Sequence, residues 1–214
     1  MGLMLRINMH QSNLYKSFKN FLDYIIALAI LIISSPLNMI IIICIYILDG
    51  KPIFFRQKRS GIDCRPFSII KYRTMLCNNY SDNSSFTDEK RITRFGNFLR
   101  STSLDELPNL INVLQGNMSI IGPRPLPIEY NNLYNNFQIK RHKVKPGITG
   151  LAQVKGRNLL SWDEKFKLDV KYVESISFLL DISIILQSIS IILSRKGVSS
   201  KKSATMEPFT GNNY

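Results

Sequence analysis

The sequence predicts a helix-rich α+β protein in which one domain is attached to a single N-terminal membrane helix. The helix is predicted by residues 25–48, a run of 24 residues that carries no charge and includes 20 apolar side chains, long enough to cross a bilayer. A β-hairpin is predicted by two short strand-like segments around a turn. Two further segments place apolar residues at helical spacing behind capping residues, as expected for helices of a packed domain.

Charge and cysteine content narrow the class of protein. The 214 residues include 28 Lys and Arg against 15 Asp and Glu, a formal net charge of +13. Such an excess requires an anionic partner: nucleic acid, an anionic membrane surface or phosphorylated ligands. The three cysteines are widely spaced and form no CxxC pair. The composition therefore excludes a disulfide scaffold, predicts no zinc site and favours a reduced, cytosol-facing chain.

The membrane run is interrupted at its centre. Ser35 and Pro36 stand midway along it, and a proline removes a backbone donor and kinks a helix. Basic residues lie on both sides of the run, so the positive-inside rule permits both ends to be cytoplasmic. The residues alone leave two alternatives open, a re-entrant helix and a kinked helix that spans the membrane.

The predicted hairpin and a polar loop follow the membrane run. Strands are expected at 53–57 and 66–72, because turn residues at 60–63 separate them. Residues 77–90 are rich in Asn, Ser and Asp and predict a loop. The predicted division of the chain is a membrane element with its lead-in at residues 1–50, a domain at 51–194 and a polar C-terminal tail at 195–214.

Three helices are expected in the rest of the domain. The first begins at Ser103, where Glu106 three residues later suggests a capping box, and Pro108 is expected to distort its first turn. A second capping box starts the next helix at Ser161. The apolar segment 178–193 is too short to span a membrane comfortably and predicts an interfacial or core helix.

Two adjacent acids, Asp105 and Glu106, stand out in a chain with few acids. They lie in the first turn of a predicted helix, where free N–H groups and the helix dipole favour their ionised forms. One carboxylate can attack phosphorus to give an acyl phosphate while its neighbour holds a metal ion. Acids at a helix N-terminus are also ordinary caps, so the pattern alone leaves a structural role open.

Basic residues near turns favour phosphate chemistry. Arginines in fixed positions suit bidentate binding of phosphate, and cations neutralise the charge that develops during phosphoryl transfer. The alternative for each is a solvated basic surface. The candidates are Lys71, Arg73, Arg100, Arg124, Arg141 and Arg157. Nucleic acid is not expected as the partner, because the basic residues gather at turn motifs rather than along one helix face with stacking aromatics.

A set of long motifs runs through this part of the chain. The longest is RFGNFLRSTSLDELP at residues 94–108, and shorter ones include GPRP at 122–125, KPGITG at 145–150 and AQV at 152–154. These motifs resemble the bacterial sugar transferases, the monotopic phosphoglycosyl transferases of glycan assembly. The resemblance covers nearly the whole chain, from Lys16 to about Leu193.

The resemblance implies transfer of a phospho-sugar from a UDP-sugar to a polyprenol phosphate, with undecaprenyl phosphate as the expected acceptor, and release of UMP. It makes Asp105 the nucleophile that forms a covalent phospho-sugar intermediate. Glu106 completes the dyad, and the pair works with Mg²⁺. Lys71, Arg100 and Arg124 match family positions implicated in phosphate binding.

The resemblance also implies a membrane helix broken at Ser35–Pro36 that enters and leaves on the cytoplasmic face of the bacterial inner membrane. It thus favours the re-entrant alternative, with basic flanks against anionic lipids. The reaction would be the first membrane step of surface polysaccharide or glycoprotein glycan assembly, and homo-oligomerisation stays open. The chain departs from the family pattern at Asn20, Leu151 and Lys155, where Arg, Trp and Asn are usual. The competing hypothesis is a non-catalytic basic peripheral membrane-binding protein.

Overall fold

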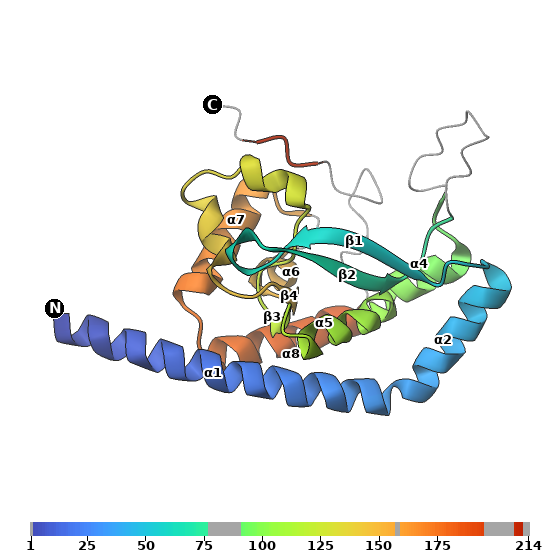
Figure 1. Ribbon diagram of the computed structural model, residues 1–214, viewed down its shortest axis with the longest axis horizontal. Coiled ribbons are helices and arrows are strands. Elements are labelled where there is room, and N and C mark those ends of the chain that lie inside the picture. Colours follow the sequence, from blue (N-terminus) through green and yellow to red (C-terminus); the bar gives the residue numbers. More distant parts are fainter. Residues whose placement is uncertain (1, 77–90, 157–158, 195–207, 212–214) are drawn as a thin grey trace.

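The computed structural model describes residues 2–76, 91–156, 159–194 and 208–211, with side chains from residue 15 onward. The loop predicted at 77–90, Arg157 and most of the predicted tail lie outside the described residues. The described part is helix-rich and contains two small two-stranded sheets, one antiparallel and one parallel. Figure 1 shows the long N-terminal helix running along one side of the domain, with its first turns projecting beyond it.

The N-terminal element is a bent pair of helices. Helix α1 spans Gly2–Ile33 and α2 spans Ser35–Leu48, with a 62° bend between them. The break lies at the predicted place, because Pro36 occupies the first turn of α2, where its missing N–H is tolerated. The Asn38 side-chain amide donates to Ser34 Oγ over 3.0 Å and ties the two helices across the break.

By length and apolarity, this pair is the candidate membrane element. Among the described residues, no single helix is long and apolar enough to cross a bilayer; Tyr15–Ile33 and Ser35–Leu48 qualify together, but in a bent form. Helix α1 already begins at Gly2, so the predicted lead-in is continuous with it. The sequence prediction of a broken apolar helix is confirmed.

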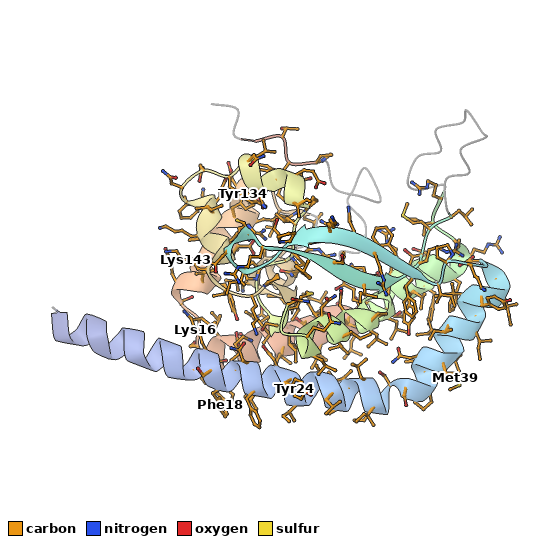
Figure 2. All side chains as sticks on the ribbon, viewed as in Figure 1. Lys16, Phe18, Tyr24, Met39, Tyr134 and Lys143 are labelled. Carbon is orange, nitrogen blue, oxygen red and sulfur yellow. The ribbon has the colours of Figure 1, made fainter. Side chains whose placement is uncertain are left out.

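Apolar side chains cover the outer faces of α1 and α2. Figure 2 shows Phe18 and Tyr24 of α1 pointing away from the domain. Ile33 at the bend is 80% exposed, and Met39 of α2 is 65% exposed. Helix α8, Phe178–Ser194, adds Leu179, which is 79% exposed. Exposed apolar patches of this kind mark surfaces that contact a membrane or a partner.

The predicted hairpin is present. Strand β1, Phe54–Ser60, pairs antiparallel with β2, Pro66–Tyr72. The chain reverses between them through a short 3₁₀ turn, η1, at Ile62–Cys64. The pairing sets Phe55 opposite Lys71, so the register places Lys71 near the end of β2, where it can meet the helices that follow.

The helix predicted from Ser103 begins differently. Helix α4, Arg94–Ser101, is followed by a 3₁₀ helix, η2, at Leu104–Asn109 and by α5, Leu110–Leu114. Ser103 adopts a left-handed conformation with φ 58°, and its side chain caps nothing. The predicted capping box is therefore wrong, because the Glu106 carboxylate bonds to distant basic residues instead. The predicted distortion by Pro108 is confirmed, since it lies inside the 3₁₀ helix.

The second sheet was not predicted. Strand β3, Ser119–Ile121, pairs in parallel with β4, Gly147–Thr149. Gly122 and Gly147 allow the close approach of the segments, because a Cβ at Gly147 would stand 2.1 Å from the Gly122 nitrogen. The 3₁₀ helices η3, Ile128–Asn132, and η4, Gln138–Lys143, lie between these strands in the chain.

The C-terminal part is helical. Helix α6 spans Leu151–Lys155 and α7 spans Trp162–Glu174, followed by α8. The predicted capping box of Ser161 and Glu164 is confirmed at the start of α7. The predicted apolar helix at 178–193 is confirmed as α8.

A buried polar network fixes α1 against α8 and β3. The Lys19 ammonium lies 3.0 Å from an Asp181 carboxylate oxygen, and Tyr15 and Tyr172 both donate hydroxyl hydrogen bonds to Asp181. Asp23 of α1 accepts a hydrogen bond of 2.6 Å from Ser119 of β3. Because buried charges are stable only when paired, this network specifies one position of α1 on the domain.

The described part of the predicted polar tail is not a free tail. Phe209 is 5% exposed and packs among aromatic rings. Its ring centroid lies 5.0 Å from that of Phe166 and 5.5 Å from that of Trp162. The Phe209 backbone N–H donates to the Tyr130 hydroxyl over 3.0 Å. The described residues 208–211 therefore pack on the domain through Phe209.

Candidate active site

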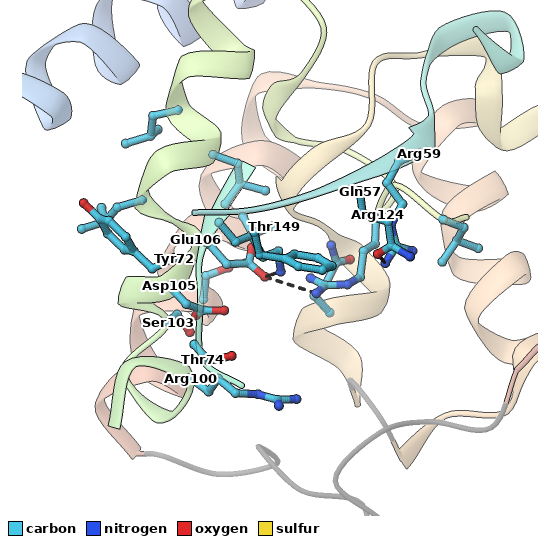
Figure 3. A pocket seen from close by; sticks show the side chains of 18 of the residues that line it. Gln57, Arg59, Tyr72, Thr74, Arg100, Ser103, Asp105, Glu106, Arg124 and Thr149 are labelled. Atoms are coloured by element: carbon cyan, nitrogen blue, oxygen red, sulfur yellow. Dashed lines mark hydrogen bonds and ion pairs between the residues drawn. The ribbon is translucent and has the colours of Figure 1, made fainter. Parts of the chain in front are cut away.

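A large cleft lies between the β1–β2 hairpin and neighbouring helices. Its volume is about 1090 Å³. The cleft is bordered by β1, β2, η2, the segment around Arg124, and helices α6, α7 and α8. Figure 3 shows Asp105 and Glu106 facing its centre, with Arg124 beyond Glu106.

Glu106 is held by two cations. The Lys71 ammonium lies 2.5 Å from Glu106 Oε1, and Arg124 Nη2 lies 3.2 Å from the same oxygen. Burial would raise the pKa of Glu106, but Lys71 and Arg124 outweigh burial and hold that pKa well below its usual range. Glu106 is therefore ionised throughout the physiological pH range.

Asp105 has a different environment. No hydrogen bond or ion pair to its carboxylate is found within the described part of the chain. Burial raises its pKa to about 6; the Glu106 charge adds to this rise, whereas Lys71, Arg124 and Arg100 oppose it. The result is a carboxylate that is ionised at pH 7 and directed at the cleft.

The local fold explains how the dyad meets Lys71. Asn109, at the end of η2, accepts a hydrogen bond of 3.0 Å from the Ile70 backbone N–H of β2. This bond holds η2 beside the strand residue that precedes Lys71. The left-handed Ser103 and the 3₁₀ geometry that follows set both acids at the cleft, where Glu106 meets Lys71 of the strand.

The predicted basic residues separate into two groups. Lys71, Arg100 and Arg124 lie at the cleft around the dyad. Arg73 donates to the carbonyl oxygens of Asp49, Gly50 and Lys51, which ties β2 to the turn after α2.

Arg141 is 2% exposed and bonds to Asp169 over 2.7 Å and to the Arg124 carbonyl oxygen over 2.7 Å. It thereby supports the segment that carries Arg124, and these contacts describe a structural role. For Arg73 and Arg141, phosphate binding stays a prediction.

Three residues at the cleft were missed by the sequence analysis: Arg59, Trp162 and Lys165. In the sequence alone, Arg59 is one of the basic residues that follow the membrane helix. The signal that could have found it is strand alternation, because Gln57 and Arg59 are half-buried whereas Arg56 and Lys58 are exposed.

A family model described as bacterial sugar transferase matches residues 14–195. The chain belongs to the bacterial sugar transferase family. The predicted family and the predicted transferase class are thereby confirmed.

Individual relatives agree. The chain is 42% identical over 194 residues to a Bacillus subtilis protein named "Uncharacterized sugar transferase EpsL", covering 91% of this chain and 96% of the relative. It is 39% identical over 178 residues to the Klebsiella pneumoniae UDP-glucose:undecaprenyl-phosphate glucose-1-phosphate transferase, covering 78% of this chain but 38% of that protein. It is 42% identical over 159 residues to galactosyl transferase CpsE of Streptococcus agalactiae, covering 68% of this chain and 35% of that protein.

Proposed function

We propose that the family member described here transfers a sugar-1-phosphate from a UDP-sugar to a polyprenol phosphate, undecaprenyl phosphate being the expected acceptor, and releases UMP. The observation that carries this proposal is the Asp105 carboxylate, unpaired within the described residues, beside an acid held by Lys71 and Arg124 at one cleft. The names of the relatives supply the substrate classes. The pathway is assembly of a surface polysaccharide or another glycan, at its first membrane step.

The proposed chemistry follows from the two environments. An Asp105 oxygen forms a bond to the sugar-linked phosphorus, and the bond from that phosphorus to the bridging oxygen breaks. The electron pair stays on the bridging oxygen, which leaves with UMP. A phosphate oxygen of polyprenol phosphate then attacks the same phosphorus, and the Asp105 carboxylate is regenerated. Lys71 and Arg124 hold Glu106 and add positive charge near the transferred group.

The dyad suits Mg²⁺. Asp105 is a carboxylate without a bonded partner in the described residues, and a cation there would stabilise its ionised form against burial. The described residues contain no cluster of three or more His, Cys, Asp or Glu side chains. Two carboxylates are nevertheless typical of Mg²⁺, which keeps several waters and binds substrate phosphates. Asp105 and Glu106 would hold the ion, and Mg²⁺ would neutralise charge on the diphosphate.

We further propose that the bent helix pair is re-entrant and holds the cleft at the cytoplasmic face of the bacterial inner membrane. The support is the break at Ser34, the apolar outer faces of α1 and α2, and basic residues near both ends. Anionic lipid head groups complement these flanks. This placement lets a cytosolic nucleotide sugar and a membrane-bound acceptor meet at one site.

The test is UMP release across a panel of UDP-sugars, with undecaprenyl phosphate and Mg²⁺. We expect release with a specific sugar and its loss, by a factor above about 10³, in Asp105→Asn, because the nucleophile is removed. Asp163→Asn is the matched control, since that acid lies exposed in the first turn of α7. Wild-type rates in Asp105→Asn would refute the covalent mechanism. Absence of turnover with every donor, combined with membrane release by salt, would favour the non-catalytic alternative.

A further inference from the structure

A second group of cations occupies the end of the cleft away from Asp105. The distal cation cluster consists of Arg59 on β1, Lys165 on α7 and Arg124, which stands between this cluster and the dyad. Figure 3 shows Arg59 and Arg124 close together beside Gln57, with Asp105 and Arg100 on the other side of Glu106. The cleft thus has a dyad end and a distal basic end.

Arg59 is poorly satisfied by the protein. Its Nη2 donates to Gln57 Oε1 over 2.6 Å, but its Nε is buried without a hydrogen-bond partner. Within the described ranges, no acidic side chain forms an ion pair with it. Burial and the nearby Arg124 charge together lower its pKa to about 10, against the opposing influence of Tyr130 and Glu129.

Lys165 is a second cation of the cleft that lies near Arg124. Burial and Arg124 lower its pKa to about 8, against the opposing influence of Asp169. Its ammonium lies 5.0 Å from the Trp162 ring centroid, so an aromatic face stands next to the charge. Cations gathered in a cleft raise the free energy of the unliganded protein, and an anion placed among them relieves it.

We propose that Arg59 and Lys165, together with Arg124, form the subsite for the nucleotide phosphate of the donor, the phosphate that stays with the leaving nucleoside monophosphate. This inference rests on the proposed function. In an in-line displacement, the leaving oxygen lies on the side of the phosphorus opposite the nucleophile. With Asp105 at one end of the cleft and Arg124 in the middle, the leaving phosphate reaches Arg59 and Lys165.

The assignment gives these side chains a role in the first half-reaction. When the bond between the transferred phosphorus and the bridging oxygen breaks, its electron pair stays on the leaving phosphate, whose charge grows. Fixed cations at that place stabilise the charge as it develops. They have no such role in the second half-reaction, in which polyprenol phosphate replaces the nucleotide. Arg59 and Lys165 therefore should act on formation of the intermediate and on UMP affinity.

The experiment compares binding of UMP and of uridine by calorimetry in Arg59→Gln and Lys165→Gln. Matched controls are Lys58→Gln, the exposed neighbour on β1, and Lys167→Gln, an exposed lysine on α7. We expect each cleft variant to bind UMP about 10-fold more weakly, as for loss of one charged hydrogen bond, with uridine binding unchanged. Thermal stability should be unchanged or higher, because a like charge has been removed from the cluster.

Half-reaction kinetics complete the test. Release of UMP from a UDP-sugar should slow in both cleft variants, while transfer from a preformed intermediate to polyprenol phosphate keeps its wild-type rate. The subsite is overturned if the variants bind UMP with wild-type affinity, or if they lose uridine binding and UMP binding equally. In that case, turnover by the wild-type chain would still support the proposed function. If the wild-type chain neither binds UMP nor releases it, both proposals fail.

Discussion

Asp105 and Glu106 are adjacent in the chain, yet the fold gives them opposite electrostatic environments. One carboxylate oxygen of Glu106 contacts both Lys71 and Arg124, and these cations stabilise its negative charge. Asp105 is buried beside that charge and has no such bonded cation in the described residues. A pair of carboxylates whose pKa values diverge in this way is typical of sites that divide two tasks between two acids. Glu106 fits a fixed anchor, and Asp105 fits the attacking group.

This division predicts the pH dependence of the first half-reaction. Asp105 attacks only when ionised, and its pKa is about 6. Without Mg²⁺ the ionised fraction of Asp105 should fall about tenfold per pH unit well below pH 6, and Mg²⁺ bound at the dyad should move this acid limb of UMP release to lower pH. Glu106, whose pKa is low, should not contribute to this acid limb. A pre-steady-state burst measured from pH 5 to 8 at several Mg²⁺ concentrations tests the expectation, and an acid limb that does not shift with Mg²⁺ contradicts it.

At the scale of elements, short sequence patterns predicted the features that depend on contacts between neighbouring residues. The break at Pro36, the hairpin and the capped start of α7 each follow from a few neighbouring residues, and each is present. The start of the dyad helix was predicted wrongly, because Lys71 and Arg124 lie 35 and 18 residues from Glu106 and outcompete a local cap. The parallel pair of β3 and β4 has three residues in each strand, too few for a periodic pattern.

For the site residues too, sequence patterns do not predict contacts between distant segments. A motif places Asp105 and Glu106 together, but no sequence pattern tells a cleft arginine from one that supports the fold. Arg141 is paired with Asp169, 28 residues away, whereas Arg59 reaches the cleft through the alternation of a strand. Such differences depend on which distant segment lies opposite each side chain.

The bent helix pair predicts the same membrane side for both of its ends. Cysteines introduced by Lys16→Cys and Lys51→Cys, in a chain without its native cysteines, should react with an impermeant maleimide only in inside-out vesicles. The reason is the bend of 62° at Ser34, which allows both helices to lie oblique to the membrane plane, as the proposed re-entrant arrangement requires. Pro36→Ala should restore a backbone donor, straighten part of the population and expose Lys51→Cys on the opposite side. If the cysteines at positions 16 and 51, in chains that keep Pro36, are labelled from opposite sides of the membrane, the helix pair spans it.

At the scale of the whole molecule, polar contacts of helix α8 connect the apolar helix α1 to the cleft. Asp181 of α8 binds Lys19 of α1, and Ser188 of the same helix bonds to Thr149 at the cleft wall over 2.7 Å. The orientation of the cleft relative to the apolar faces is thereby fixed by buried polar contacts. In the proposed reaction the two substrates come from different phases, and this fixed relation would let one nucleophile serve both.

The C-terminal segment packs on α7, a helix that borders the cleft. Phe209 packs on Trp162 and Phe166 of α7, the helix that also carries Lys165. Phe209→Ala should lower the free energy of unfolding by about 3–5 kcal/mol, because it removes a buried aromatic ring. It should also weaken UMP binding by loosening Trp162, while the acid limb set by Asp105 stays in place. Thr210→Ala, at an exposed neighbour, should change stability by less than about 0.5 kcal/mol. Denaturant unfolding in detergent measures both variants, and equal stability of the two would show that residues 208–211 do not support the domain.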